Sequence, residues 1–451
     1  MSNDINNHIW KFTHTHDRTG RIIKLDRSGI IAGQQHPNEY FWEIDNNVLI
    51  FKSLDKKISN VFDFSSFDGS RLEGHFVLWE NSGIETCLTV ADDIRVLDQV
   101  SVYQIADKNC IIVDSKNVES RKVLYSNTIH EDTNYEASRI DLAYLRNVEV
   151  INMYGSVKKD DYIVKESMSH FPFHYDKQIS KISEDQIAIR KSRVAVKVGR
   201  AIHAFHGVSG NYYHWMILFI CKIGYCAHNV EDMDRCVVLL PDYLNEVQKR
   251  SAEIVSQYYN LPIIRLCDDL AVEVEELLFP HEPDSIGIRT HPEIMQTFDL
   301  IKKSISAVNA AASDLIYISR TDTNFRILEN ESRVEEILGS FGFKIIHLSG
   351  TSLDEQVSIL SGAKVVVSPH GAGLTNILFC EPGTKVLEFQ SPGHINWCMK
   401  NLACLAKLEY GCLMGESTED DRYVILEGDL IDALRCFEIS GNGISNYNDK
   451  N

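Results

Sequence analysis

Hydrophobic residues beyond residue 193 come in short apolar runs separated by amphipathic stretches, and this pattern predicts strands that alternate with helices. In the first series, the predicted strands are residues 194–198, 201–206, 236–240, 263–266 and 272–279, and the predicted helices are 212–227, 243–259 and 292–312. In the second, the strands are 315–319, 343–348, 364–368 and 386–389, the helices are 331–341 and 352–362, and a last helix and strand lie within 392–410 and 423–427. The repeated alternation favours an α/β fold class with two doubly wound lobes, parallel sheets and a cleft between them.

The first 90 residues have a different pattern. Their predicted strands are short, aromatic and partly alternating, with Asn, Asp and Gly between them: residues 40–44, 48–52, 58–62 and 74–79. This predicts a small antiparallel β domain, whose aromatic residues form its core in the favoured interpretation and a sugar-stacking face in the alternative. The predicted division is residues 1–90 for this domain, 91–312 and 313–430 for the two lobes, and 431–451 for a C-terminal tail.

Composition narrows the choice of partners and compartment. The formal charge is 45 − 64 = −19, which argues against nucleic acid or an anionic membrane as the main partner. The start has no signal-peptide pattern, and no apolar run approaches the ~18 residues of a membrane-spanning helix. The 11 cysteines include no C-x-x-C pair, which favours buried free thiols in a reducing, cytoplasmic compartment.

The most informative segment is KVVVSPHGAGLTNILFCEPGTKVLEFQ, residues 364–390. A buried strand leads into the turn His370-Gly371-Ala372-Gly373, and a short helix follows. Glycines allow a close backbone approach, and the helix directs its free N–H groups at the turn, so the segment predicts a phosphate site. The turn lacks the last glycine and the acidic residue of the dinucleotide fingerprint, which makes NAD an unfavourable ligand.

Charged side chains at neighbouring strand ends extend this prediction. Arg320 and Arg326 follow the strand at 315–319, where two guanidinium groups could bind a diphosphate, although a solvated surface loop is the simpler reading of this spacing alone. His370 could donate to a phosphate oxygen or be satisfied by backbone. Glu388 could bind ribose hydroxyls or pair with a lysine, and both alternatives stay open.

The first lobe offers candidates for acid–base chemistry. Asn211 and His214 open a predicted helix after a glycine loop, and the helix dipole there favours the neutral imidazole that acts as a base. The alternative is that His214 only packs the lobe. Asp232 and Asp234 have D-x-D spacing but precede a strand, on the wrong edge of the sheet for a metal-bound nucleotide. No metal site is therefore predicted.

Three segments, GNYYHWMILF (210–219), ISRTDTNFRILENE (318–331) and SLDEQVSILSGAKVVVSPHGAGLTNILFCEPGTKVLEF (352–389), resemble glycosyltransferase family 61. That family includes eukaryotic protein O-linked N-acetylglucosaminyltransferases, plant xylan transferases and bacterial proteins of capsule synthesis. The resemblance covers roughly residues 140–430. It implies a GT-B fold of two Rossmann-like lobes, inverting transfer without a metal or other cofactor, a nucleotide sugar that is UDP-linked, and a glycan or glycoconjugate acceptor of surface polysaccharide synthesis.

The resemblance also implies residue roles. The expected donor contacts are Arg320, Arg326, Asn330, His370, Gly371, Ala372, Gly373, Asn376 and Glu388. The expected acceptor side holds Asn211, Tyr213, His281 and the candidate base His214, with His206, Asp242 and His281 as rival bases. One departure is that Leu218, Cys221 and Lys222 stand where the family pattern has an acidic residue followed by Pro-Arg.

Three functions remain after this comparison. A sugar transferase is favoured, while a nucleotide-sugar hydrolase or epimerase would use the same nucleotide site. A non-catalytic carbohydrate-binding or assembly subunit would retain the fold alone, and the departure at Leu218 supports it. Peripheral contact with polysaccharide-assembly proteins is an expectation only, and the sequence leaves the sugar, the acceptor and the oligomeric state open.

Overall fold

The structure, a computed structural model, describes residues 5–439 except for 34–35, 80–81, 108–110, 115, 119–122, 129–134, 169–178, 206–209, 283–289, 306–312 and 419–421. The chain forms two compact units. The first contains residues 1–106, 145–199 and 265–277, and the second contains residues 107–144, 200–264 and 278–451. The predicted domain boundaries near residues 90, 312 and 430 stay predictions.

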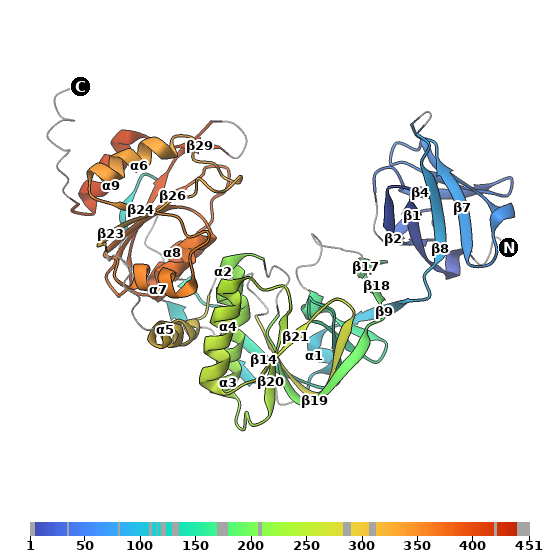
Figure 1. Cartoon of the computed structure of the whole chain (residues 1–451), viewed down its shortest axis with the longest axis horizontal. Helices are drawn as coiled ribbons and strands as arrows, with labels where there is room; N and C mark the ends of the chain where they lie inside the picture. The colour runs from blue at the N-terminus through green and yellow to red at the C-terminus, as the bar shows by residue number, and fades with distance from the viewer. Residues whose placement is uncertain are drawn as a thin grey trace. The chain divides into compact units, whose positions relative to one another are not determined.

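An eight-stranded antiparallel sheet forms the start of the first unit (Figure 1). Its order is β3-β2-β1-β8-β7-β6-β5-β4. Edge strands β3 and β4 meet at an antiparallel bridge between Ile30 and Phe41, so the sheet curls back on itself. Its strands are β1 (Ile9–His14), β2 (Asp17–Leu25), β3 (Ile31–Gly33), β4 (Phe41–Asp45), β5 (Val48–Lys52), β6 (Ile58–Asp63), β7 (Arg71–Phe76) and β8 (Glu85–Val90).

Aromatic side chains fill the inside of this sheet. Trp10, Phe51 and Phe62 have no exposed surface, and the Phe51 and Phe62 rings lie 4.9 Å apart between centroids. The favoured interpretation of these aromatics as core is therefore confirmed for these three residues. Trp79 differs, since 60% of its surface is exposed.

The second sheet has eleven strands, and β14, β19, β21 and β22 contribute residues to both units. Its main path is β17-β18-β9-β16-β15-β14-β22-β19-β20-β21, and β10 pairs with β14. The bounds are β9 (Ile94–Val100), β10 (Ile111–Val113), β14 (Ile140–Ile151), β15 (Ser156–Lys159), β16 (Tyr162–Val164), β17 (Ile179–Lys181), β18 (Gln186–Arg190), β19 (Arg193–His203), β20 (Cys236–Pro241), β21 (Ile263–Leu266) and β22 (Leu270–His281).

This sheet contradicts the predicted fold class of two Rossmann-like lobes in a GT-B arrangement. The pair β19–β20 is parallel, but β14–β15, β15–β16 and β9–β18 are antiparallel. Tight turns join the hairpins, and Asp160 at the β15–β16 turn has a left-handed φ of 51°. The prediction is wrong because a buried strand has the same apolar pattern whether its neighbour runs parallel or antiparallel.

Helices cover the part of this sheet that lies in the second unit. A continuous helical segment comprises α2 (Tyr212–His214), a π-helical stretch (Trp215–Phe219) and α3 (Ile220–Asn229), and α4 (Glu246–Tyr259) and α5 (Ile294–Ser304) follow. Asn245 and Gln248 form a capping box at the start of α4. The indole N–H of Trp215 donates to Ser251 Oγ at 2.8 Å, which links the π-helical stretch to α4.

A six-stranded parallel sheet lies in the second unit between two helical layers (Figure 1). Its order is β12-β27-β26-β25-β23-β24. The strands are β12 (Val123–Ser126), β23 (Leu315–Ile318), β24 (Lys344–Ile346), β25 (Val365–Pro369), β26 (Lys385–Gln390) and β27 (Glu409–Met414). The helices are α6 (Glu331–Ser340), α7 (Leu353–Ser361), the 3₁₀ helix η6 (Ala372–Phe379), α8 (Cys398–Leu405) and α9 (Glu427–Cys436).

Alternating residues of these strands pack against opposite layers. Val366 and Val386 belong to the core shared with α7 and α8, whereas Val367 and Leu387 belong to the core shared with α6 and α9. The predicted capping box at Ser352 is confirmed at the start of α7.

The remaining described elements are short. They are α1 (Val102–Ile105), η1 (Ile5–Asn7), η2 (Phe64–Ser66), η3 (Lys165–Met168) and the two-stranded pairs β11 (Asn117–Val118) with β13 (Tyr135–Glu136) and β28 (Glu416–Ser417) with β29 (Tyr423–Val424). Within the described part of the chain, no helix has the combined length and apolar character that crossing a membrane requires.

Candidate active site

The connections of the parallel sheet diverge between β23 and β25. From β23 the chain moves outward to β24, and it then returns to β25 on the other side of β23. In open α/β sheets, ligands bind outside the carboxyl ends of the strands at such a point. Arg320 follows the carboxyl end of β23, and the turn His370-Gly371-Ala372-Gly373 follows that of β25. The structure therefore brings these two predicted donor segments together.

Arg320 lies directly against the glycine turn. Its Nη1 donates to the carbonyl of His370, and its Nη2 donates to Thr323 Oγ1 at 3.5 Å. Its backbone N–H donates to Glu331 Oε1 at 2.7 Å, and that oxygen also accepts a hydrogen bond from the Tyr317 hydroxyl at 2.9 Å. The buried Glu331 carboxylate thus fixes the backbone from which the guanidinium extends.

A second guanidinium increases the positive charge here. Burial lowers the pKa of Arg320, and the neighbouring positive charge of Arg326 lowers it further. Arg326 has a left-handed φ of 52°, and its buried Nε has no hydrogen-bond partner in the described structure. Neither guanidinium forms an ion pair with a carboxylate among the described residues. Two like charges brought together in this way favour an anion between or beside them.

The turn itself has no room for a side chain at Gly371. A Cβ there would lie 2.6 Å from Arg320 Cζ and 3.0 Å from Nε, and closer still to Nη1. The φ of Gly371 is 177°, which any residue can adopt, so packing against Arg320 is the constraint. No side chain caps the amino end of η6, so its first N–H groups remain available to an anion.

His370 belongs to a buried hydrogen-bond network with Glu388 and Tyr410. His370 Nδ1 lies 2.5 Å from Glu388 Oε1, and the Tyr410 hydroxyl donates to Glu388 Oε2. Glu388 has no exposed surface, and His370 is 6% exposed. Burial, followed by the charge of Glu388, raises the pKa of Tyr410 well above its usual value. Because Glu388 has no exposed surface, a ribose could reach its carboxylate only if neighbouring side chains moved.

A cavity of about 630 Å³ lies beside the turn, within the size range of small-molecule sites. It is lined by the connection after β24, by Gly373 and Asn376 of η6, and by residues at the start of α4. Asn376 is fully buried: its Oδ1 accepts from the Tyr212 hydroxyl at 2.7 Å and its Nδ2 donates to Gln356 Oε1 at 3.1 Å. Glu246 is the charged residue of the lining.

Comparison with known proteins identifies the domain that contains this site. Residues 212–387 match the family model described as Glycosyltransferase 61. The chain carries a glycosyltransferase family 61 domain. A search of curated proteins found no match to the chain. The matched segment contains Arg320, Arg326 and the whole glycine turn, so the family resemblance drawn from the sequence is confirmed and the activity class is that of a glycosyltransferase.

In the family 61 domain, Asn330 bonds the backbone of Ile425 through both polar atoms of its side chain. Its Nδ2 donates to the Ile425 carbonyl at 2.7 Å, and its Oδ1 accepts from the Ile425 N–H at 3.1 Å. It precedes α6 without capping the helix through its side chain. The observed contacts of Asn330 join two segments of backbone, and its predicted donor contact stays a prediction.

The predicted acceptor residues lie at the start of the α2 helical segment and at the end of β22. Asn211 caps α2 by accepting from the N–H groups of Tyr213 at 2.9 Å and His214 at 3.4 Å, as the sequence predicts for a helix start. His214 is half-buried, and its ring lies edge-on to Tyr213 with centroids 5.7 Å apart. His281 ends β22.

The structure also places Asp242, one of the rival bases, and the acidic pair Asp232 and Asp234. Asp242 is exposed after β20, while His206 lies outside the described residues. Asp232 and Asp234 precede β20, at its amino end, as the sequence indicates. Among the described residues, no three or more His, Cys, Asp or Glu side chains gather as a metal site.

Lys222 stands at the departure from the family pattern. Its Nζ donates to the Phe205 carbonyl beyond the end of β19. Burial lowers the pKa of Lys222 to about 8, against the opposing influence of Glu282. Lys222 therefore keeps a basic, partly buried group at the arginine position of the family pattern, and Leu218, which replaces the acidic residue, is buried.

Sequence reasoning missed Tyr212, Glu331 and Tyr410 as site residues. Tyr212 is next to the named residues Asn211 and Tyr213, but only the helix geometry shows which tyrosine reaches Asn376. Tyr410 is 22 residues from Glu388, and the parallel register of β26 and β27 brings them together. The one signal in the sequence was Glu388 within the apolar run 386–389, because a buried carboxylate requires a polar partner.

Proposed function

We propose that the chain is an inverting glycosyltransferase that moves a sugar from a UDP-linked donor to a hydroxyl of a glycan or glycoconjugate acceptor. The observation that carries the proposal is Arg320, which lies against the glycine turn at the divergence point of the parallel sheet in a family 61 domain. The charge of Arg326 is close enough to lower the pKa of Arg320. Surface polysaccharide synthesis is the biological role that fits the family resemblance.

The donor diphosphate would bind to the two guanidinium groups and to the N–H groups at the start of η6. These groups supply positive charge where the leaving diphosphate gains negative charge, so the proposal needs no metal ion or other cofactor. The uncharged part of the donor would occupy the cavity beside Gly373 and Asn376, whose lining is mostly polar and uncharged. His370, held by Glu388, would orient its other ring nitrogen toward the diphosphate.

Transfer would proceed by direct displacement at the anomeric carbon. The acceptor oxygen forms the new bond to this carbon on the face opposite the diphosphate, the carbon–phosphate oxygen bond breaks, and the electron pair leaves with UDP. A base takes the acceptor hydroxyl proton, and His214 at the start of the α2 segment is our candidate, with Asp242, His281 and His206 as rivals. Ten described cysteines are free thiols, which supports a reducing, cytoplasmic site of reaction.

The first experiment is a nucleotide panel measured by thermal stabilisation and calorimetry, with EDTA present. We expect UDP to bind, and we expect Arg320→Ala and Arg326→Ala each to weaken binding by about tenfold or more, since each removes a charged hydrogen-bond donor. Arg333→Ala is the matched control because Arg333 pairs with Glu427 on the surface. Binding that requires a divalent cation, or equal binding by all variants, would contradict the proposed site.

A second experiment separates transfer from the alternative functions. The chain is incubated with UDP-sugars with and without oligosaccharide acceptors, and UDP release and the anomeric configuration of the product are measured. Acceptor-dependent release with inverted configuration supports the proposal. Equal release without acceptor indicates a hydrolase, and UDP-sugar binding without any release across the panel indicates a non-catalytic binding subunit.

A further inference from the structure

The uncharged part of the donor consists of two groups, the sugar and the nucleoside, which the diphosphate joins. The sugar is the group that reacts, so it must lie within reach of the base. Tyr212 lines the cavity beside Gly373 and belongs to the same helical segment as His214, the candidate base. The cavity is therefore the place for the sugar, and the nucleoside requires a separate surface beside the diphosphate.

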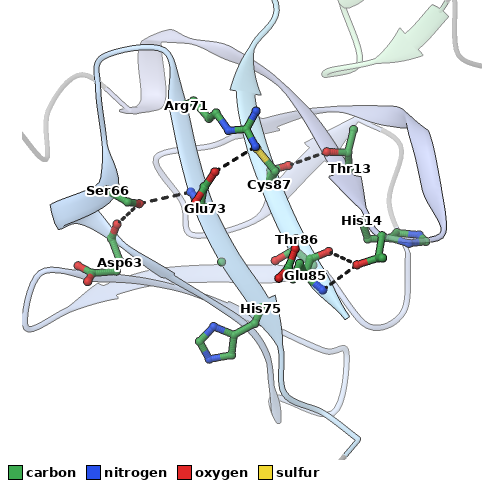
Figure 2. Close-up of a pocket in the computed structure, with 12 residues that line it drawn as sticks. Thr13, His14, Asp63, Ser66, Arg71, Glu73, His75, Glu85, Thr86 and Cys87 are labelled. Atoms are coloured by element: carbon green, nitrogen blue, oxygen red, sulfur yellow. Dashed lines mark hydrogen bonds and ion pairs between the residues drawn. The ribbon is translucent and has the colours of Figure 1, made fainter. Parts of the chain in front are cut away.

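Two other cavities of the described structure do not provide this surface. A pocket of about 840 Å³ on the eight-stranded sheet is lined by the carboxylates of Asp63, Glu73 and Glu85 and by the guanidinium of Arg71 (Figure 2). Three carboxylates against one guanidinium disfavour a diphosphate. A cavity of about 710 Å³ lies at the amino ends of β23, β25 and β26, the edge of the parallel sheet opposite to the glycine turn. The connections at the carboxyl edge, which adjoin the turn, remain for the nucleoside.

The connection between β23 and α6 leads away from the cavity. Near its start, Asp322 accepts a hydrogen bond from Ser349, which lines the cavity. Near its end, the Ile327 carbonyl accepts a hydrogen bond from the N–H of Tyr423 in β29 at 3.1 Å. Tyr423 belongs to the core shared with α6 and α9, whereas η6 and α7 pack on the other face of the sheet. The residues between Asp322 and Ile327 therefore extend to the side of the site away from the cavity.

Phe325 lies in this connection, close to the Arg320 guanidinium. Its backbone N–H donates to Thr323 Oγ1 at 3.4 Å, and the same oxygen accepts from Arg320 Nη2 at 3.5 Å. The two distances add to 6.9 Å, which is the upper limit for the separation of the Phe325 nitrogen from Nη2. The next residue is Arg326, and burial followed by its charge lowers the pKa of Arg320. Phe325 therefore adjoins both guanidinium groups of the proposed diphosphate site.

The side chain of Phe325 is open to solvent. It is 72% exposed, which makes it the most exposed large hydrophobic side chain among the described residues. Single hydrophobic residues are common on protein surfaces, so the exposure alone assigns no role. Its position does, because a ligand whose diphosphate binds the two arginines brings its next group to this ring. A phenyl ring has no polar atom, and it therefore favours a flat, uncharged group over a charged one.

A nucleobase is such a group, since every base has a π face that stacks on an aromatic side chain. We infer that Phe325 stacks on the nucleobase of the donor, while Arg320 and Arg326 bind the diphosphate and the cavity beside Gly373 holds the sugar. The inference rests on the proposed function, because it takes the ligand to be a nucleotide sugar. It adds the surface that binds the nucleoside, and it places the two ends of the donor on different sides of the diphosphate.

The test measures, by calorimetry on the full chain, the affinities for UDP and for inorganic pyrophosphate, which has the diphosphate and lacks the base. We expect Phe325→Ala to weaken UDP binding by about tenfold and to leave pyrophosphate binding unchanged. Phe325→Tyr retains the aromatic face and should bind UDP as the parent does. Urea denaturation should give the parent stability for both variants, because the replaced side chain is exposed.

The matched control is Tyr258→Ala, because Tyr258 is an exposed aromatic residue near the end of α4, whereas the cavity reaches α4 at its start. It should leave both affinities unchanged. The inference is overturned if the parent binds UDP and Phe325→Ala binds it equally well, even where this variant raises the KM for an acceptor. It is also overturned if Phe325→Ala weakens UDP and pyrophosphate alike, since that indicates a disturbed arginine loop. Failure of the parent to bind UDP would contradict the proposed function itself, and the inference with it.

Discussion

The substitution Gly371→Ala tests whether Arg320 must lie against the glycine turn. The added Cβ would lie 2.6 Å from Arg320 Cζ, within the van der Waals separation of two carbon atoms. The backbone at Gly371 is extended, with a φ of 177°, so the change introduces no backbone strain. The arginine side chain is flexible and can move away, and we therefore expect a loss of only about 1 kcal/mol in the free energy of unfolding.

Nucleotide binding should be much more sensitive than stability. A displaced guanidinium forfeits its hydrogen bonds to the diphosphate, which are worth about 1.5–3 kcal/mol, or roughly a ten- to hundredfold loss of UDP affinity. The assays are urea denaturation for stability and calorimetry for UDP. Gly339→Ala is the control, because a Cβ there would meet nothing within 4 Å, and it should leave UDP affinity unchanged.

A double-mutant cycle distinguishes this mechanism from a general disturbance of the turn. In an Arg320→Ala background, the added methyl group meets no guanidinium, so Gly371→Ala should cost little further stability or affinity. The reasoning is refuted if Gly371→Ala has the same effect in both backgrounds, or if it leaves UDP affinity at the parent value.

Three further predictions concern the buried groups around the site. Tyr410→Phe removes the hydroxyl that donates to the buried Glu388 carboxylate and should lower the free energy of unfolding by about 1–3 kcal/mol, measured by urea denaturation; an unchanged value would contradict the role of this bond. Tyr212→Phe should lower it by about 1 kcal/mol, because Asn376 Oδ1 loses its 2.7 Å bond, and Tyr258→Phe at an exposed site is the control. Lys222 has a pKa lowered from 10.5 to about 8 in the folded chain, so its ionisation opposes folding below pH 8, and this cost disappears as the pH rises toward 10.5. The free energy of unfolding of the parent should therefore rise relative to Lys222→Met by about 3 kcal/mol between pH 7 and pH 10.5, and a pH-independent difference would show that Lys222 is not buried in this way.

The local features of the parallel sheet were predictable from sequence. The strand β21 has the predicted bounds, and Ser352 caps α7 as its spacing indicates. Arg320 and the turn after β25 were both expected at strand carboxyl ends, and they meet there. These predictions succeed because strands, caps and glycine turns depend on residues close in sequence.

Strand direction and long-range pairing were not predictable in the same way. The edge strand β12 pairs in parallel with β27 across almost 300 residues, and nothing in its four residues specifies that partner. The antiparallel pairs of β9, β14 and β15 replaced the expected second parallel lobe for the same reason. The helix α9 lies partly in the segment expected to be a tail, since its apolar face becomes evident only against β12 and β27.

For the candidate site too, local features were predictable from sequence and long-range contacts were not. The residue types that bind phosphate were visible in sequence, but the partners that orient them were not. Glu388 was expected to touch the nucleoside, and the structure shows it fully buried between His370 and Tyr410. The register of three adjacent strands, which the sequence does not specify, determines the position of this carboxylate. Ser368 lies beside Glu388, and Glu388 lies beside Cys412.

The central claim is that the donor diphosphate binds between the two arginines and the glycine turn, and the most direct test is the structure of the chain crystallised with UDP. The account predicts diphosphate oxygens within hydrogen-bond distance of the Arg320 and Arg326 guanidinium groups and of N–H groups at the start of η6. A diphosphate bound away from both arginines, or held through a metal ion on carboxylates, would contradict it.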